Sequence, residues 1–421
     1  MAKRIILKSG LRLILHPMQN TKTITLLVLL ATGSKYESQN LNGISHLLEH
    51  LFFKGTKKRP TTLDIAKELD GVGGAYNAFT GKEVMGFWVK VSAKHFPLAA
   101  DVLSDMLFNP LFEQKEMEKE KKVVFEEINM IEDDPQRHIS DLFEKLLYGD
   151  QPAGRLIIGN KQTLTPISRD DIIKQFHRHF TAKNIVISVA GNIDSQTLVP
   201  ELAKVFDKFR KIEPPVKLPV GEKQDTPQAL LHFKETGQTH LCLGVRAFSL
   251  SSPNRYIMDV ISSVLGGSMS ARLSVEVRQK RGLAYYVSTS LGEYTDSGYL
   301  VTQAGVDNSR LDEALITILN EYKKIRTKKV PRQELEKVKE NIKGRMLLGL
   351  ETSDAWAAYN GEQEILEQRV LSPEEECAKI DSVSQADILR VAKEIFAPER
   401  LNLALIGPFK DKERFEKLLK L

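Results

Sequence analysis

Two similar apolar runs lie 215 residues apart in this chain: Leu26-Leu-Val-Leu-Leu-Ala-Thr-Gly-Ser34 and Leu241-Cys-Leu-Gly-Val-Arg-Ala-Phe-Ser249. Each run has the composition of a buried strand, and a polar loop and a helix-like stretch follow it. A second pair closes the two halves at a nearly equal offset: Asn184-Ile-Val-Ile-Ser-Val-Ala-Gly191 and Leu401-Asn-Leu-Ala-Leu-Ile-Gly407. The sequence therefore predicts a duplicated domain of roughly 200 residues.

A proline-rich segment separates the two halves: Ile212-Glu-Pro-Pro-Val-Lys-Leu-Pro-Val-Gly-Glu-Lys-Gln-Asp-Thr-Pro227. Its four prolines and several charges are typical of an extended linker. We therefore expect an N-terminal domain over residues 1–211, a linker over 212–227 and a homologous C-terminal domain over 228–421. A chain of 421 residues is long for a single core, which agrees with two domains.

Strand-like and helix-like patterns are mixed within the first half and do not alternate regularly. This order favours an α+β fold over a doubly wound sheet. We expect two homologous domains, each a mostly antiparallel sheet with helices packed on it. Strand patterns cover Gly10–His16, Thr23–Ala31 and Val84–Val91, and helical spacing covers Leu63–Leu69, Leu98–Met106 and Glu113–Ile131.

The composition is that of an ordinary globular protein, with 42% hydrophobic and 27% charged residues. The net charge of +5 is spread along the chain, and no RRM, zinc-finger or helix-turn-helix motif is present, so we expect no nucleic-acid partner. The apolar run Ile24–Ala31 is too short to span a bilayer, and charges interrupt the basic start before a signal-peptide core forms. We therefore expect no membrane partner.

The chain has two cysteines, Cys242 and Cys377, and neither has a CxxC neighbour. They cannot supply a metal quartet, and a single disulfide between them would be unusual in a cytosolic protein. The expected location of the protein is the cytoplasm.

One helix carries a pair of metal-ligand candidates. Asn42 is a plausible N-cap and Gly55 a plausible residue just past the end, which brackets a helix of about twelve residues. Within it, His46 and His50 share a face because they are four residues apart, so both imidazoles can point at one ion. Glu49 lies at the edge of that face, close to the metal without having to bind it.

A third ligand must come from elsewhere, because a catalytic zinc usually takes three protein ligands and one water. The best candidate is a helix over Glu113–Met130, in which Glu120 and Glu127 lie seven residues apart on or near the apolar face. Glu126 points roughly 100° away and should be solvated. A carboxylate on an apolar face is costly unless it is paired or bound to metal. Glu127 is thus a ligand candidate, with Glu120 as its supporting partner.

Each of these patterns also has a plain structural explanation. A histidine pair four residues apart on a helix can be two satisfied polar side chains. A glutamate-rich helix alone is more often a solvated face than a site.

The wider sequence resembles the pitrilysin family of zinc metallopeptidases. His46-Leu-Leu-Glu49-His50 is the inverted zincin motif HxxEH, and the mitochondrial processing peptidase-like branch of the family is the most similar. In that family the third ligand is a glutamate that corresponds here to Glu127, 77 residues after His50. A further glutamate seven residues earlier corresponds to Glu120, which the resemblance places in the catalytic site.

Further segments carry the same resemblance along the whole chain. Gly73-Gly-Ala-Tyr-Asn-Ala-Phe-Thr80 resembles the family's Gly-x-x-Asn-Ala-x-Thr stretch. In the second half, Gly266-Gly-Ser-Met-Ser-Ala-Arg-Leu273 is followed by Arg278 and Tyr285, which are similar to the family's Arg–Tyr pair. One departure is Gln151-Pro-Ala-Gly-Arg155, where relatives often carry His-Pro-Leu-Gly-Arg. It puts no catalytic role in doubt.

The resemblance implies a zinc-dependent endopeptidase that hydrolyses peptides held in a closed chamber. One Zn²⁺ per active site would be held by His46, His50 and Glu127. Glu49 would act as general base on zinc-bound water and return the proton to the leaving amine.

The resemblance also implies how substrate and subunits come together. Arg278 and Tyr285 would donate hydrogen bonds to the substrate carbonyl or its oxyanion. In the short-chain branch this pair comes from a partner chain, which implies a homodimer, or a heterodimer with a paralogue. The peptide would bind as an added strand along Asn77 and Ala78, beside the segment that runs to about Val91. Asn77 can equally cap a turn, and Tyr285 can equally belong to a core.

Two alternative functions remain. Some members of the family are inactive subunits that serve as peptide binders or structural partners, although these usually lose a ligand or the base. A zinc hydrolase that acts on esters or other bonds is the second alternative, and the strand-like substrate segment argues against it.

Overall fold

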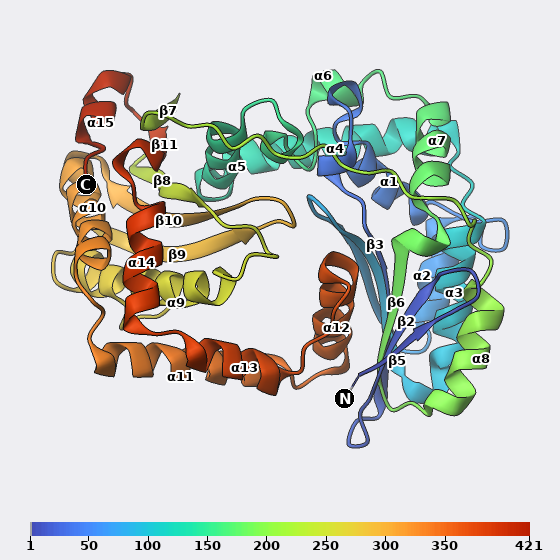
Figure 1. Ribbon diagram of the computed structural model, residues 1–421. Helices are drawn as coiled ribbons and strands as arrows, with labels where there is room; N and C mark the ends of the chain where they lie inside the picture. Colours follow the sequence, from blue (N-terminus) through green and yellow to red (C-terminus); the bar gives the residue numbers. More distant parts are fainter. Residues whose placement is uncertain (1) are drawn as a thin grey trace. The chain divides into compact units, whose positions relative to one another are not determined.

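The computed structural model describes residues 2–421, which form two compact units, each built around one β-sheet (Figure 1). Neither unit is a contiguous half of the sequence. The first contains the chain up to Asn129, Arg155–Leu218 and Leu348–Ser372. The second contains Met130–Gly154, Pro219–Leu347 and Pro373–Leu421.

The sequence suggested domains over residues 1–211 and 228–421 with a linker over 212–227. The compact units exchange segments across these boundaries. The sequence halves and the compact units differ because residues 130–154 and 348–372 each pack with the other half of the chain. The linker segment, residues 212–227, contains neither helix nor strand. The next strand begins directly after it, at Gln228.

The sheet of the first unit has six strands in the order β1-β2-β6-β3-β5-β4. All neighbouring strands are antiparallel except β2 and β6. The predicted strands are confirmed, with ends that differ by one or two residues. The strands are β1 Lys3–Ile6, β2 Arg12–Pro17, β3 Thr23–Leu30, β4 Ala75–Thr80, β5 Met85–Ser92 and β6 Ile185–Gly191.

The sheet of the second unit has five strands in the order β7-β11-β8-β10-β9, and only β7 and β11 are parallel. This repeats the order and directions of β2-β6-β3-β5-β4, so the predicted duplication and the α+β class are confirmed. The strands are β7 Gln228–Phe233, β8 Gln238–Ala247, β9 Ala284–Glu293, β10 Gly298–Asp307 and β11 Leu401–Gly407.

Helices cover both faces of the first sheet. On one face the Phe52 ring of α1 contacts Phe87 of β5, with ring centroids 4.9 Å apart. On the other face α12 packs against β2, β3 and β6. The helices of this unit are α1 Ile44–Phe52, α2 Thr62–Asp70, α3 Phe96–Phe108, α4 Gln114–Asp133, which runs into the second unit, α6 Lys161–Leu164, α7 Arg169–His179, α8 Ser195–Phe206 and α12 Ser353–Glu367.

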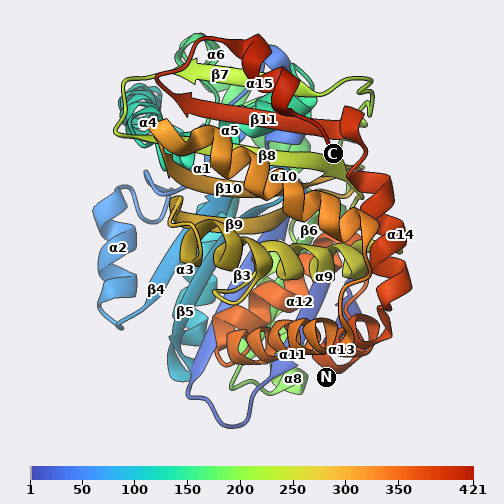
Figure 2. The same ribbon diagram turned by 90° about the vertical axis from the view of Figure 1, so that its left-hand side faces the viewer.

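The second sheet is covered in the same way. Figure 2 shows α9, α10 and α14 in front of its strands, and α5 packs on the opposite face against β7, β8 and β11. Because both faces are covered, β6 and β11 are buried along their whole length, which explains their continuous apolar sequences. The helices are α5 Pro135–Tyr148, α9 Arg255–Gly266, α10 Leu311–Thr327, α11 Arg332–Gly349, α13 Pro373–Ser382, α14 Gln385–Ile395 and α15 Lys412–Leu418.

Each sheet therefore receives one covering helix from the other half of the sequence: α12 for the first and α5 for the second. A glycine allows close approach in both cases. A Cβ on Gly361 of α12 would lie 2.7 Å from Leu29 and 2.9 Å from Ser188. In the second unit the glycine is on the sheet instead, where a Cβ on Gly244 would lie 2.9 Å from the Phe143 ring of α5.

A buried carboxylate fastens α12 to the first sheet. Both carboxylate oxygens of Glu364, whose side chain has no exposed surface, accept hydrogen bonds from Arg4 of β1 at 2.8 and 2.9 Å. Arg12 of β2 donates to the same carboxylate at 3.2 Å and to the Glu364 carbonyl at 3.1 Å. Two strands near the N-terminus of the chain thus bind a helix that lies far along it, in the C-terminal part of the sequence.

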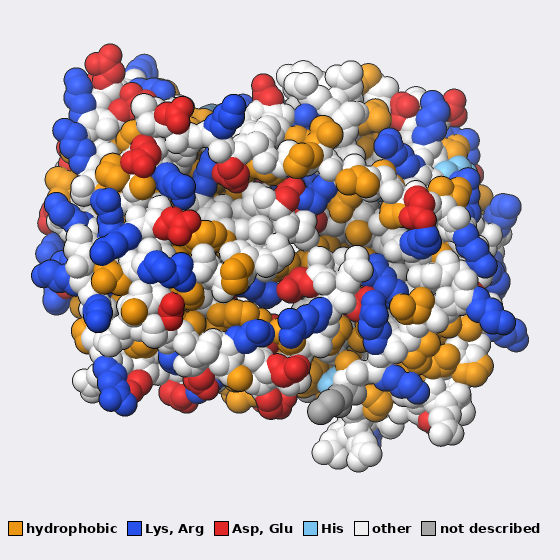
Figure 3. Space-filling model, viewed as in Figure 1, with side chains coloured by type: hydrophobic (Ala, Val, Ile, Leu, Met, Phe, Trp, Pro, Cys, Tyr) orange, Lys and Arg blue, Asp and Glu red, His pale blue; other side chains and the backbone are white. Residues whose placement is uncertain are grey.

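Charged side chains are interspersed over the surface. Figure 3 shows Lys and Arg mixed with Asp and Glu on the face that it presents, without one large patch of a single sign. Cys242 and Cys377 are both free, and Cys242 is buried beneath α5. Over residues 2–421, no helix combines the length and the apolar character that crossing a bilayer requires.

We predict that Glu364→Gln destabilises the first unit by roughly 2–3 kcal/mol. Breaking a fully buried ion pair typically costs 3–5 kcal/mol, but Arg4 is 44% exposed and regains solvation. Calorimetry should show its unfolding transition lowered by about 5–10 °C. Glu394→Gln, which removes an exposed carboxylate from α14, is the control and should unfold like the natural protein. An unchanged transition in Glu364→Gln would contradict the fastening role.

Candidate metal centre

The helix α1 begins later than the sequence predicted. Its N-cap is Gly43, in the left-handed conformation with φ 96°, and the predicted cap Asn42 lies outside it. The buried carboxylate of Glu37 does the capping instead, because it accepts hydrogen bonds from the N–H groups of Gly43 and Ser45 at 2.8 Å. The Asn42 amide also donates to Glu37, at 3.0 Å. Burial raises the pKa of Glu37, and these donors oppose that rise.

The two histidines of α1 converge with a glutamate of α4, as predicted. The Nε2 atoms of His46 and His50 each lie 3.7 Å from Oε2 of Glu127. One ligand atom from each residue lies within 4.8 Å of the others. A tetrahedral zinc with bonds of about 2.1 Å would hold its ligand atoms roughly 3.4 Å apart. The three residues therefore fit a zinc ion with one position left for a further ligand.

The protonation state of His46 suits a metal site. Burial, and next the neighbouring His50, lowers the pKa of His46 to about 4. Its imidazole is therefore neutral at pH 7 and keeps a lone pair for a metal. The two rings lie 4.7 Å apart between centroids and 62° from parallel, so their nitrogens approach one point from different directions.

Glu120 contacts the side of the His50 ring that is turned away from Glu127. Its Oε2 lies 3.2 Å from Nδ1 of His50, while Nε2 of that ring faces Glu127. A carboxylate on the far nitrogen of a metal-binding histidine fixes its tautomer and orientation. Lys54 binds the other oxygen of Glu120 at 2.8 Å. Burial acts to raise the pKa of Glu120, but the hydrogen bonds to His50 and Lys54 outweigh it and lower that pKa.

Lys54 was not found from the sequence. It follows His50 by four residues but lies beyond the end of α1 at Phe52, so helical spacing does not indicate this contact. The Nδ1 atom of His46 is buried and makes no hydrogen bond with any described residue. Only one of the two imidazoles is thus held by a protein partner.

Glu49 lies beside the three ligands and has its own partner. The hydroxyl of Thr80, the last residue of β4, donates to Oε2 of Glu49 at 2.6 Å. Burial raises the pKa of Glu49, against the hydrogen bond from Thr80 and the attraction of His50. The sequence contained Thr80 within a family-like stretch but did not assign it a role. Its hydroxyl orients the carboxylate of Glu49.

The edge of the first sheet runs past this cluster. Asn77 is exposed and its Oδ1 accepts the N–H of Ala78 at 2.9 Å, while Ala78 is buried on the α1 side. Within residues 2–421, β4 pairs with β5 alone, so its other edge has no strand partner there. β5 is paired on both sides, with β3 and β4, and cannot receive a further strand. The expectation that substrate lies beside the segment as far as Val91 is therefore corrected to β4 alone.

Arg278 and Tyr285 belong to the second compact unit, whereas the metal cluster belongs to the first. Arg278 is exposed in a π-helix, Ser274–Gln279, a rare form that is frequent at functional sites. Tyr285 is 78% exposed on the edge strand β9, so it is not a core residue. Neither side chain makes a hydrogen bond with the described residues.

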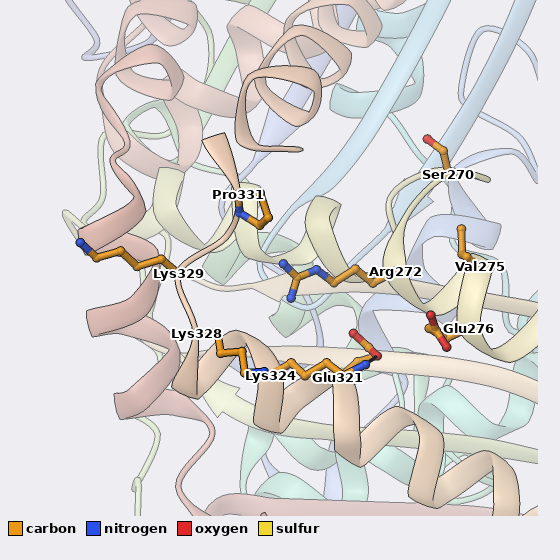
Figure 4. A pocket seen from close by; sticks show the side chains of 9 residues that line it. All are labelled: Ser270, Arg272, Val275, Glu276, Glu321, Lys324, Lys328, Lys329 and Pro331. Atoms are coloured by element: carbon orange, nitrogen blue, oxygen red, sulfur yellow. Dashed lines mark hydrogen bonds and ion pairs between the residues drawn. The ribbon is translucent and has the colours of Figure 1, made fainter. Parts of the chain in front are cut away.

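A cavity of about 390 Å³ lies against this π-helix, and Figure 4 shows Arg272 and Glu321 reaching toward it. Arg272 makes two hydrogen bonds to Glu334 of α11, at 2.8 and 2.7 Å. This pair anchors the loop that leads into the π-helix and so helps to hold Arg278 in place. The cavity is lined by Ser270, Arg272, Val275, Glu276, Glu321, Lys324, Lys328, Lys329 and Pro331.

We predict that Glu127→Gln weakens zinc binding at least tenfold, because it replaces a charged ligand by a neutral amide. The neighbouring Glu126→Gln is the matched control, since Glu126 is exposed and points away from the cluster. Competition with a chromogenic chelator measures both variants. Natural affinity in Glu127→Gln would reassign the third ligand.

Comparison with known proteins agrees with this geometry. The family described as Insulinase (Peptidase family M16) matches residues 12–161, and Peptidase M16 inactive domain matches residues 166–342. An uncharacterized zinc protease of Bacillus subtilis, YmxG, is 36% identical over 409 residues, 97% of this chain and 98% of that protein. An uncharacterized zinc protease of Streptomyces coelicolor is 33% identical over 417 residues, 98% of this chain and 90% of that protein.

Solved structures show the same fold. A protease from Helicobacter pylori superimposes with a TM-score of 0.89 at 23% identity, over 97% of this chain and 99% of that one. A chain of Complex III2 from Candida albicans superimposes with a TM-score of 0.86 at 18% identity, over the full length of both. With these relatives and a His-His-Glu cluster that could hold a metal ion, the chain belongs to the M16 family of metallopeptidases, the insulinase or pitrilysin family.

Proposed function

We propose that this protein is a zinc-dependent endopeptidase that hydrolyses peptides held in a closed chamber. The observation that supports this most directly is the convergence of His46, His50 and Glu127 beside a separately held Glu49. All the residues that ligate metal and move a proton are present in one cluster. The proposed compartment is the cytoplasm, on the sequence grounds given above.

The chemistry follows from the charges of the cluster. When bound, zinc supplies Lewis acidity: it lowers the pKa of a water molecule toward about 7 and polarises the scissile carbonyl. Two neutral imidazoles and the single charge of Glu127 leave the site electrophilic. Glu49 takes the proton from the attacking water and returns it to the leaving amine. Thr80 holds the carboxylate of Glu49 for both transfers, and Glu120 holds the His50 ring.

The peptide adds to the sheet at the free edge of β4. Main-chain hydrogen bonds to an exposed edge give affinity with loose sequence preference. Thr80, at the end of β4, contacts Glu49 directly, so a peptide on this edge passes the base. This edge favours a peptide substrate over an ester or another small molecule.

Arg278 and Tyr285 are proposed to stabilise the oxyanion, since both are exposed and their donors are uncommitted. In this proposal they act on the metal cluster of a second copy, which makes the working form a homodimer. A paralogue in place of the second copy is the heterodimeric version of the same arrangement. The rival function, a catalytically inactive peptide-binding or structural subunit, is disfavoured by the intact base and ligands.

We predict that Glu49→Gln abolishes peptide cleavage, by at least a thousandfold, and keeps its zinc. The amide has nearly the same shape as the carboxylate but cannot take a proton, and Glu49 is not one of the three ligands. A quenched-peptide assay, with and without chelator, and metal analysis of the same sample measure the two effects. Normal turnover in Glu49→Gln, or zinc-loaded natural protein that cleaves no peptide, would contradict the proposed activity.

A mixing experiment tests the shared site. We predict that Glu49→Gln chains mixed with Arg278→Ala chains regain about a quarter of natural activity. Half of the random dimers are mixed, and each mixed dimer has one site with both an intact base and an intact arginine. The control is the double variant, in which every chain carries both substitutions. Its dimers should stay inactive. Failure of the mixture to regain activity, with mixed dimers shown by co-purification through a tag on one variant, would contradict the dimeric site.

A further inference from the structure

A second cavity lies on the face of the first sheet that α12 covers. The helix α1, which carries His46 and His50, lies on the opposite face. Its volume is about 290 Å³, at the small end of the range for ligand pockets, which suits a single side chain. Strands β3, β4 and β5 and the first turns of α12 all contribute to it. It is lined by Thr25, Leu27, Phe79, Trp88, Asp354, Ala355 and Ala358.

Two aromatic rings form its walls. Phe79 of β4 lies across Gly86 of β5, where a Cβ would come within 2.4 Å of the ring. The absent side chain at Gly86 thus allows the ring to lie over the sheet. Phe79 is nevertheless 37% exposed and Trp88 is part-exposed, so their faces are not used up by the core. Ala355 and Ala358 are small, which leaves the space open on the helix side.

The only charged group in the lining already has a partner. Asp354 accepts a hydrogen bond from Lys90 of β5 at 2.6 Å. A charged guest would have to compete with this pair or lose its hydration against apolar walls. An apolar guest has no such cost and gains contact with two rings.

The cavity is connected to the proposed substrate edge through Phe79. Successive side chains of a strand point to opposite faces. On β4, Thr80 faces Glu49 of α1, and Phe79 faces the opposite way, toward α12. A peptide added beside β4 presents its own alternate side chains to the same two faces. Those on the α12 side lie next to Phe79 and the cavity.

We propose that this cavity is a specificity pocket for an aromatic or branched aliphatic side chain of the bound peptide, on the strand face turned away from the metal helix. The pocket rests on the proposed peptidase function and adds to it a preference that the metal cluster does not supply. The guest is held by the rings of Phe79 and Trp88 over the floor of Leu27. Selection at this position is independent of the chemistry at Glu49.

The test uses the full-length zinc enzyme and a set of quenched peptides that differ at one residue, scanned through each position as Phe, Leu, Ala or Asp. We expect one position at which Phe or Leu gives kcat/KM at least tenfold above Ala. Ala358→Phe fills the cavity and should lower kcat/KM for the Phe and Leu peptides to the value for the Ala peptides. Ala358→Ser is the matched control and should keep the preference.

Two further measurements separate the outcomes. Trp88→Ala enlarges the pocket and should shift the preference from Leu toward the larger Phe, which keeps the test open if Ala358→Phe fails to fold. Binding of the same peptides to Glu49→Gln should show the same selectivity in Kd. Zinc-loaded enzyme that cleaves none of the peptides overturns the proposed function and the pocket with it. Normal cleavage with a preference that survives in folded Ala358→Phe overturns the pocket alone.

Discussion

Each sheet has two apolar faces, and this constraint shapes the path of the whole chain. Helices from its own half cover one face, and the other would leave a core exposed to water. α12 closes the first sheet over Ile14, Leu27 and Leu29, and α5 closes the second over Cys242 and Ala404. Each of these two helices packs on the sheet of the other half of the sequence, which needs close contact between helix and sheet. A glycine provides it in both units, on the helix in the first and on the strand in the second.

At the metal centre, four carboxylates differ in the partners that they contact. Glu37 accepts backbone N–H groups and holds the start of the metal helix. Glu120 is occupied by His50 and Lys54, and Glu49 by Thr80. Glu127 alone faces both imidazoles. An unpaired buried carboxylate is costly, so Glu37 and Glu120 stay with their own partners and do not compete for the metal. Glu127 is then the charged ligand and Glu49 the base.

β4 connects the chemistry to recognition. Its period of two places Thr80 on the side of the metal helix and Phe79 on the side of α12, while its backbone edge stays free. One short strand therefore offers a peptide a base on one face, an apolar cavity on the other and hydrogen bonds between them. Since α12 comes from the second half of the sequence, that half contributes to the substrate surface of the first unit.

Local patterns in the sequence predicted the duplicated α+β fold, the strands β3, β6, β8 and β11, and the candidate ligand pair His46 and His50. These follow from periodicity and short-range spacing, which act within one element. Glu127 was proposed from the apolar face of its own helix and from the family resemblance, and the fold brings it beside α1. Tertiary structure alone decided the cap at Glu37, the hydroxyl of Thr80 on Glu49 and the exchange of α5 and α12. Each of these joins residues that are distant along the chain or offset between elements. No local pattern encodes such contacts, because they form only when whole faces are buried together.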